Sequence, residues 1–439
     1  MKILTQVVCL LFFCAPIIAQ DGFRFTSNKK KTSIPFKLIN NLIIVPIEVN
    51  GIELNFLLDT GVEETILFSL DEKEELKLYD VQKIKLKGLG IEEAIEGLKS
   101  SGNILRFPGM EYRNHDVLIV LDQDINFSST LGIPVNGIIG FHFFKDNMVQ
   151  INYSQKKIYV YNQAMINRKK LLRKYDKYSF TLERSKPYIQ VMVTIGQDPF
   201  PAKCLIDTGN SDALWLFDSQ SDQIQVPQKN FEDFLGRGFS GSIYGKRAKI
   251  PAVAIDKFIF KSPVTAFPDS VSIKNVQLAN NRLGSIGGGL LKRFNIIFDY
   301  SNKQFFLKKN SHFSDPFKYN TTGIDIHHSG LQWVQETYRL QPQFNFTDKS
   351  DLPADSPELR YSFKLKPVFE ILNVRKGSPA ETAGLMKGDV IVSVNNKSAY
   401  RLTLQQINSL LRANEGFIAI IVKRNDNEIK FRFKVQDLL

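Results

Sequence analysis

Two short segments of this 439-residue chain place an aspartate at the end of an apolar run and directly before a Thr-Gly pair. The first reads Phe-Leu-Leu-Asp-Thr-Gly and ends at Gly61, and the second reads Cys-Leu-Ile-Asp-Thr-Gly and ends at Gly209. A strand that ends in this way presents its carboxylate to a cleft. A glycine in the turn lets the backbone approach that charge closely, because it has no Cβ. Asp59 and Asp207 are therefore the candidates for chemistry.

Two carboxylates a few ångströms apart can hydrolyse a peptide bond without a metal or a covalent intermediate. Like charges at that distance do not both ionise, so the pair shares one proton and its two apparent pKa values separate. One member can then take a proton from water while the other protonates the carbonyl oxygen. The two pKa values belong to the pair rather than to either residue.

The elements around the two aspartates are repeated as well. Asp207 follows Asp59 by 148 residues (207 minus 59), and Gly88 and Gly90 recur at the same separation as Gly236 and Gly238. Further on, residues 151–156 are echoed by residues 298–303. This self-similarity indicates a duplicated unit of about 150 residues. Short apolar runs separated by turn residues, such as Asn50-Gly51, predict that each copy is rich in β-strands.

Over residues 35–310 the chain resembles the aspartic proteases. The resemblance rests on the two Asp-Thr-Gly segments and on the apolar-Gly segments that follow each by about eighty residues, Gly137 to Gly140 and Gly284 to Gly287. It implies a mainly β fold with two retropepsin-like lobes, related by a pseudo-twofold axis in a bilobal acid-protease architecture. It also implies that a set of loop residues supports the Asp59/Asp207 dyad: Thr60, Gly61, Thr208 and Gly209.

The family further implies a mobile hairpin, or flap, over bound substrate. Its candidate residues here are glycines and one tyrosine: Gly88, Gly90, Gly236, Gly238 and Tyr244. Ordinary glycine-rich loops are the alternative interpretation. The residues after each Asp-Thr-Gly depart from the pepsin pattern, in which a hydroxyl group bonds the carboxylate. Val62 has no donor and Asn210 has an amide, so a catalytically inactive site that kept both loops is a second alternative.

The last third of the chain resembles a bacterial-type PDZ domain. The resemblance rests on Gly-Ser-Pro-Ala from Gly377, Ala-Gly-Leu from Ala383 and Gly-Asp-Val-Ile from Gly388. In that family an extended peptide adds to the edge of a strand and its terminal carboxylate meets backbone N–H groups. The expected peptide-binding residues are Pro367, Val368, Phe369, Glu370 and Ile371, with a helix at 402–411 as the other wall. A merely structural appended domain is the alternative.

The N-terminus reads as a secretory signal peptide. Lys2 precedes an apolar run that ends near Ala19-Gln20, and the run is too short for a stable membrane span. We therefore expect export to a periplasm or the cell exterior and no transmembrane span. The formal net charge is +12, concentrated in runs such as residues 29–31 and 168–174, which suggests at most a loose attraction to anionic surfaces. We find no interleaved basic and aromatic motif of the kind that binds nucleic acid.

Other chemistries find little support. The five histidines show no metal-ligand spacing, so we expect no metal and no cofactor. Cleavage of the leader would leave Cys204 as the single thiol, and its apolar strand indicates a small core residue.

The sequence thus predicts an exported aspartic endopeptidase that acts on polypeptides, with a PDZ domain for peptide or protein C-termini. A non-catalytic peptide-binding scaffold is the alternative. The expected organisation has five parts: signal peptide 1–20, lobe 1 at 21–165, lobe 2 at 166–310, connector and start of the PDZ region at 311–361 with one hairpin near 323–337, and PDZ domain 362–439.

Overall fold

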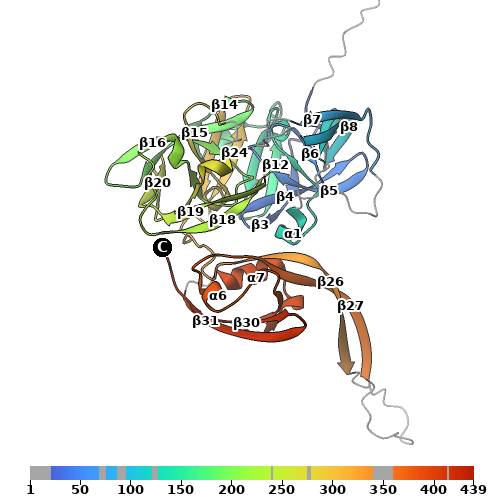
Figure 1. The fold of residues 1–439 in the computed structure, drawn as a ribbon. Coiled ribbons are helices and arrows are strands. Elements are labelled where there is room, and N and C mark those ends of the chain that lie inside the picture. The colour runs from blue at the N-terminus through green and yellow to red at the C-terminus, as the bar shows by residue number, and fades with distance from the viewer. Residues whose placement is uncertain are drawn as a thin grey trace, which may run out of the picture.

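The computed structural model describes residues 21–68, 76–86, 95–120, 127–238, 241–273, 278–339, 359–412 and 415–439. The expected signal peptide and the flap candidates Gly88 and Gly90 lie outside these ranges. Two β lobes sit side by side, and a C-terminal module lies beneath them (Figure 1). A long two-stranded ribbon projects from that module.

The lobe 1 sheet is built around a hairpin that leads into the Asp59 loop. Asn50 and Gly51 both have positive φ, 50° and 97°, and the flanking strands pair from Val49 and Ile52 outward, as a type I′ turn requires. The nine strands follow the order β1-β9-β6-β10-β5-β4-β8-β7, with β3 on β4. Their bounds are β1 (Arg24–Phe25), β3 (Lys37–Ile39), β4 (Leu42–Val49), β5 (Ile52–Leu58), β6 (Ile66–Leu67), β7 (Gln82–Leu86), β8 (Ile95–Phe107), β9 (Met110–Val120) and β10 (Gly137–Ile139).

The lobe 2 sheet repeats this plan. In each lobe the strand before the aspartate pairs in parallel with a later strand, β10 beside β5 and β23 beside β16. The ten strands follow the order β18-β19-β22-β17-β23-β16-β15-β20-β21, with β14 on β15. Their bounds are β14 (Thr181–Glu183), β15 (Lys186–Thr194), β16 (Pro199–Ile206), β17 (Leu214–Leu216), β18 (Asn230–Gly238), β19 (Gly241–Lys249), β20 (Ala252–Ile255), β21 (Phe258–Lys261), β22 (Val264–Pro268) and β23 (Arg282–Ile286).

A third sheet of six strands joins the lobes, because β11 of the first repeat pairs antiparallel with β24 of the second. Aromatic and β-branched side chains from all three sheets form one core, in which Cys204 is fully buried. The expected mainly β, two-lobed fold is confirmed. The joining strands are β2 (Lys31–Pro35), β11 (Met148–Asn152), β12 (Lys157–Tyr161), β13 (Asp176–Ser179), β24 (Phe294–Asp299) and β25 (Gln304–Lys309).

The C-terminal module has its own apolar core, to which Ile324 and Ile326 already contribute. Its first strand therefore lies before residue 362, within the expected connector. No separate hairpin forms at 323–337, because one long strand there pairs with residues 359–374. The strands are β26 (Ile324–Arg339), β27 (Leu359–Val374), β28 (Val390–Val394), β29 (Lys397–Ser398), β30 (Gly416–Arg424) and β31 (Asn427–Val435).

The described helices are short. The longest, α7, begins with a capping box in which Thr403 and Gln406 bond each other's backbone N–H groups. None of the described helices is long and apolar enough to cross a membrane. The helices are α1 (Phe127–Leu131), α2 (Phe141–Phe144), α3 (Arg168–Leu172), α4 (Ser270–Ile273), α5 (Gly288–Leu291), α6 (Pro379–Thr382) and α7 (Leu404–Leu411), with 3-10 turns at Asp218–Gln220 and Ala399–Arg401.

Candidate active site

Each catalytic candidate ends a strand and is held by the same set of backbone bonds. The N–H of Asp59 donates to Ile139 O at 3.0 Å, and that of Asp207 donates to Ile286 O at 2.9 Å. The apolar-Gly segments at Gly137 to Gly140 and Gly284 to Gly287 therefore brace the two aspartate loops. The glycine N–H two residues on then donates to each aspartate's Oδ1, at 2.7 Å from Gly61 and 3.1 Å from Gly209.

Two fully buried threonines join the loops across the lobes. The N–H of Thr60 donates to Thr208 Oγ1, and the N–H of Thr208 donates to Thr60 Oγ1, both at 3.0 Å. Each hydroxyl also donates to a carbonyl of the other lobe, Thr60 to Ile206 at 2.6 Å and Thr208 to Leu58 at 2.8 Å. All of these polar groups are thus satisfied inside the core, which fixes the position of one loop relative to the other.

The structure brings the two carboxylates together. A Cβ built on Gly61 would lie 3.0 Å from Asp59 Oδ1 and 3.2 Å from Asp207 Oδ1. Carboxylate oxygens from both lobes therefore surround one point beside Gly61, which places the two aspartate side chains next to each other. Both aspartates are only partly exposed.

Burial and proximity shift the acidity of the pair. Burial, followed by the charge of Asp207, raises the pKa of Asp59 to about 7. Burial also raises the pKa of Asp207, but the nearby cations Arg282 and Lys186 and the N–H groups of Gly209 and Asn210 oppose that rise. Arg282 therefore favours the ionised form of Asp207, and a proton that the pair retains belongs to the two carboxyl groups together.

Sequence reasoning missed these two cations. Lys186 begins β15, and the turn before it crosses to lobe 1, where Ser185 Oγ donates to Glu63 Oε1 at 2.8 Å. Arg282 begins β23 and is almost fully buried, with Nη2 donating to Ser285 Oγ at 2.5 Å and Nε to Gly284 O at 3.1 Å. No local motif marks either residue, because packing between strands far apart in sequence brings them to the site.

The residues after each Asp-Thr-Gly give the carboxylates no side-chain donor. Asn210 Oδ1 accepts the N–H of Asp212 at 2.9 Å, and its buried Nδ2 has no hydrogen-bond partner. The amide of Asn210 therefore donates no hydrogen bond to the Asp207 carboxylate. The backbone N–H of Asn210 acts on Asp207 instead.

The flap candidates of lobe 2 lie on the hairpin β18–β19. Gly236 has φ of +144° and lines a cavity to which both lobes and the C-terminal module contribute residues. Tyr244 is half exposed, and its ring meets that of Phe234 edge-on at 5.5 Å. A flap role for Gly236, Gly238 and Tyr244 stays a prediction.

The expected peptide-binding strand of the C-terminal module needs a correction. Residues 367–371 lie on β27, where Pro367, Val368, Phe369, Glu370 and Ile371 all pair with β26 and Glu370 also pairs with β28. Among the described strands, β26 pairs with β27 alone. Helix α7 lies against β26, so the groove between an open edge and the helix is one strand away from the expected place.

Lobe 1 approaches this groove through α1 and the residue after it. Helix α1 lies against β26 (Figure 1). Gln405 Nε2 of α7 donates to Leu131 O at 2.7 Å, and a Cβ on Gly132 would lie 2.7 Å from Leu404 Cβ.

A metal site was sought among the residues that the structure describes. Within the described ranges, no group of three or more His, Cys, Asp or Glu residues could hold a metal ion.

Comparison with known families agrees with this architecture. Residues 45–143 match the family model described as aspartyl protease, and residues 370–424 match the model of the PDZ domain. The two resemblances are therefore confirmed: the chain carries an aspartyl protease region in lobe 1 and a PDZ domain at its C-terminus. Among solved structures, the crystal structure of an aspartic proteinase from Irpex lacteus is similar to 65% of this chain and 99% of its own chain, at 11% identity and a TM-score of 0.39.

Proposed function

We propose that this protein is an aspartic endopeptidase that hydrolyses polypeptides at the Asp59/Asp207 pair. The observation that carries the proposal is the meeting of the two carboxylates, since a point beside Gly61 lies 3.0 Å from Asp59 Oδ1 and 3.2 Å from Asp207 Oδ1. A water molecule bound between the two carboxylates would contact both an acid and a base. The PDZ domain binds peptide segments and so supplies or positions the polypeptide.

The chain's residues divide the chemistry between them. Ionised Asp207, favoured by Arg282, accepts a proton as water attacks the scissile carbonyl carbon, and protonated Asp59 gives its proton to the carbonyl oxygen. The tetrahedral diol then collapses: Asp207 passes its proton to the leaving nitrogen while Asp59 takes one back from a diol hydroxyl. The C–N bond breaks, and both carboxyl groups return to their starting states.

The test is hydrolysis of an unfolded protein substrate by the purified chain and its variants. Asp59→Asn and Asp207→Asn should each reduce turnover by at least 10³-fold, because an amide neither accepts nor shuttles the proton. The matched control is Asp256→Asn, an exposed aspartate in a turn with φ of 50°, a conformation that asparagine tolerates. A statine-type inhibitor, which mimics the diol, should block turnover.

The alternative is a catalytically inactive scaffold that holds extended chains in its cleft and its PDZ groove. The absent hydroxyl donors at Val62 and Asn210 favour this alternative. Binding of peptides with no hydrolysis, and equal behaviour of the wild type and both Asp→Asn variants, would establish the scaffold and reject the enzyme.

We further propose that the protein is exported from the cytoplasm. This proposal rests on the charged and apolar pattern of residues 1–20, and it is tested by fractionating cells that express the full chain. Wild-type protein should leave the cytoplasm with a new N-terminus near Asp21, whereas a chain starting at residue 21 should stay inside.

A further inference from the structure

Strands β26 and β27 run on past the C-terminal module as a two-stranded ribbon (Figure 1). Near its base, Ile324 and Ile326 belong to the apolar core of the module. A bulge between His328 and Gly330 then interrupts the regular pairing, and Gly330 has φ of +147°. Because a bulge bends a strand and re-aims its side chains, the residues beyond it point away from that core.

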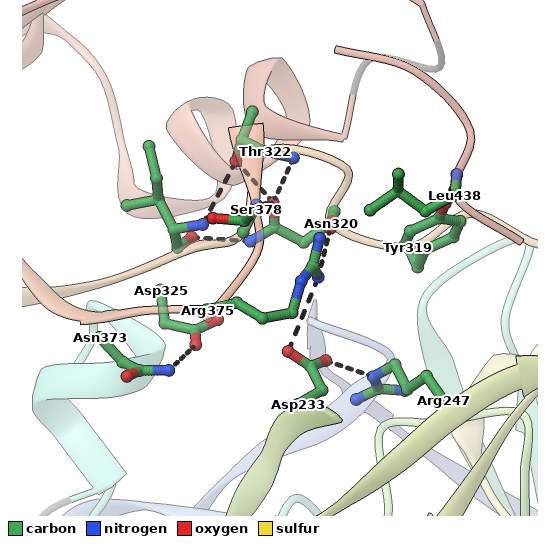
Figure 2. A network of polar contacts seen from close by, with 12 residues as sticks. Asp233, Arg247, Tyr319, Asn320, Thr322, Asp325, Asn373, Arg375, Ser378 and Leu438 are labelled. Carbon is green, nitrogen blue, oxygen red and sulfur yellow. Dashed lines mark hydrogen bonds and ion pairs between the residues drawn. The ribbon is translucent and has the colours of Figure 1, made fainter. Parts of the chain in front are cut away.

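The base of the ribbon is held by polar contacts. Asn373 Nδ2 of β27 donates to Asp325 Oδ2 of β26 at 3.2 Å, and Arg375 Nη1 lies 3.7 Å from Asp233 Oδ1 of lobe 2 (Figure 2). The buried Arg375 also donates to Asn320 O at 3.0 Å. The ribbon therefore leaves the body of the protein from a fixed base.

One face of the ribbon beyond the bulge is apolar and exposed. The register sets Leu331 opposite Pro367 and Trp333 opposite Leu365, and directly opposed residues share a face. Phe363 lies on the same face, because it is two residues from Leu365. The exposed fractions are 59% for Leu331, 69% for Trp333, 61% for Phe363 and 50% for Leu365. We call these four side chains the ribbon face.

The ribbon face is unfavourable in water. An isolated two-stranded ribbon is marginally stable at best, because no second layer covers its apolar side. The four side chains expose roughly 400 Å², a patch size that is often functional on a monomer. Two copies of a chain usually need about 800 Å² from each partner to associate stably, so this face is too small to hold a dimer on its own.

The ribbon is also basic. Lys364 and Lys366 alternate with the apolar residues of β27 and so lie on its other face. In sequence, residues 331–339 and 359–367 carry four basic residues and one acidic residue, within a chain of formal net charge +12. Tryptophan and lysine are side chains that settle where lipid headgroups meet hydrocarbon, and anionic headgroups attract the positive charge. This combination of charge and apolar surface is complementary to an anionic bilayer.

We propose that the ribbon face docks on the surface of a bilayer that contains anionic lipids. The ribbon lies at the level of the headgroups, because the backbone groups along its outer edges would have no partners in the hydrocarbon. This attachment is independent of peptide hydrolysis and goes beyond the proposed function. It places the protease lobes at a membrane surface without a spanning helix.

The test is co-sedimentation with vesicles of phosphatidylcholine alone or with a quarter of phosphatidylglycerol. The chain starts at residue 21, so that the apolar run of residues 1–20 does not contribute. We expect binding to the mixed vesicles to be at least tenfold tighter than to the neutral ones. The double variant Trp333→Ser/Leu365→Ser should bind the mixed vesicles at least tenfold more weakly than the wild type.

Phe417→Ser is the matched control, because it removes an apolar side chain of β30 that is 62% exposed and lies outside the ribbon. It should bind as the wild type does. Circular dichroism checks that both variants are folded. Equal vesicle binding by the wild type and the double variant would reject the ribbon face as the contact.

Tryptophan fluorescence locates the contact without altering the ribbon. The chain has two tryptophans, so Trp215→Phe leaves Trp333 as the sole reporter. Its emission should shift to shorter wavelength on the mixed vesicles, because the indole leaves water. Sedimentation with the vesicles at an unchanged emission maximum would place the contact elsewhere and overturn the proposal.

Two further results would assign the ribbon face to another partner. A dimer in sedimentation velocity that the double variant dissociates, in a chain that does not bind vesicles, would assign it to a second copy. A shift of the Trp333 emission with unfolded casein but not with vesicles would assign it to polypeptide. Either result would reject the lipid surface.

Discussion

Thr60 and Thr208 exchange hydrogen bonds across the two lobes, each backbone N–H donating to the other residue's hydroxyl at 3.0 Å. The two residues are 148 positions apart in the chain, and both are buried. Because each precedes a glycine that bonds the neighbouring aspartate, this contact determines how closely the two carboxylates meet.

Thr60→Val keeps the shape of the side chain but removes its hydroxyl. The change leaves the N–H of Thr208 and the carbonyl of Ile206 without their partner, so we expect a loss of about 2–4 kcal/mol in the free energy of unfolding and a large drop in kcat. Denaturant unfolding and steady-state kinetics check both. Thr265→Val is the control, since Thr265 is equally buried but makes a single bond of 3.3 Å, and should cost less. Equal losses in the two variants would contradict the role of the threonine contact.

Gly209→Ala places a methyl group in the space that the partner carboxylate occupies. The added Cβ would lie 2.2 Å from Asp59 Oδ2, so Asp59 must move away from Asp207. We expect the folded variant to lose at least 10²-fold in kcat/KM, because misplaced catalytic groups lose most of their effect. Gly196→Ala, where no atom lies within 4 Å of the new Cβ, should retain activity. Activity within threefold of wild type in Gly209→Ala would show that the pair is not the reacting site.

The pH dependence of kcat/KM should have its alkaline limb near pH 7. Asp59 must be protonated to act as the acid, and its pKa is raised to about 7, so activity falls as pH rises through that value. Lys186 lowers the pKa values of both aspartates, and Lys186→Met should therefore shift the profile upward by about one unit or less. Lys229→Met should leave the profile in place. A shift of the profile to lower pH in Lys186→Met would contradict the conclusion that Lys186 lowers the pKa values of the two aspartates.

Asp325 should make the stability of the chain sensitive to pH. Burial, then the charge of Asp233, raises the pKa of Asp325 to about 6 from an unfolded value of about 3.9. Between these values the folded state holds a proton that the unfolded state has released, so stability falls as pH rises from about 4 to about 6. Asp325→Asn cannot lose that proton and should show a smaller decline between these two pH values.

Urea unfolding at pH 4.5 and at pH 7 measures this difference. Asp256→Asn provides the control, because it removes an exposed carboxyl and should decline as the wild type does. The same decline of unfolding free energy in all three proteins would show that Asp325 does not cause the pH dependence.

Much of this molecule follows from local sequence rules. Asn-Gly at residues 50–51 and Asn-Asp at 425–426 both adopt the positive φ pairs of type I′ turns, because these residues tolerate that backbone. Asn396 also takes φ of 63°, a left-handed backbone conformation that asparagine tolerates.

The sequence does not show which strand edges are open, because pairing between distant strands determines this. Residues 367–371 carry the apolar alternation expected of a peptide-binding strand, but β26 and β28 occupy both edges around Glu370. The strand with the open edge, β26, begins in a polar stretch whose pattern resembles a connector.

By itself, the sequence determined the two aspartate loops, their duplication and the PDZ motif, because each depends on residue types at fixed short spacings. The tertiary structure alone decided that Lys186 and Arg282 act on the buried aspartates and that helix α1 of lobe 1 lies against β26. These meetings depend on how whole sheets and domains pack. Packing sums many weak contacts between distant segments, and no short stretch of sequence records that sum.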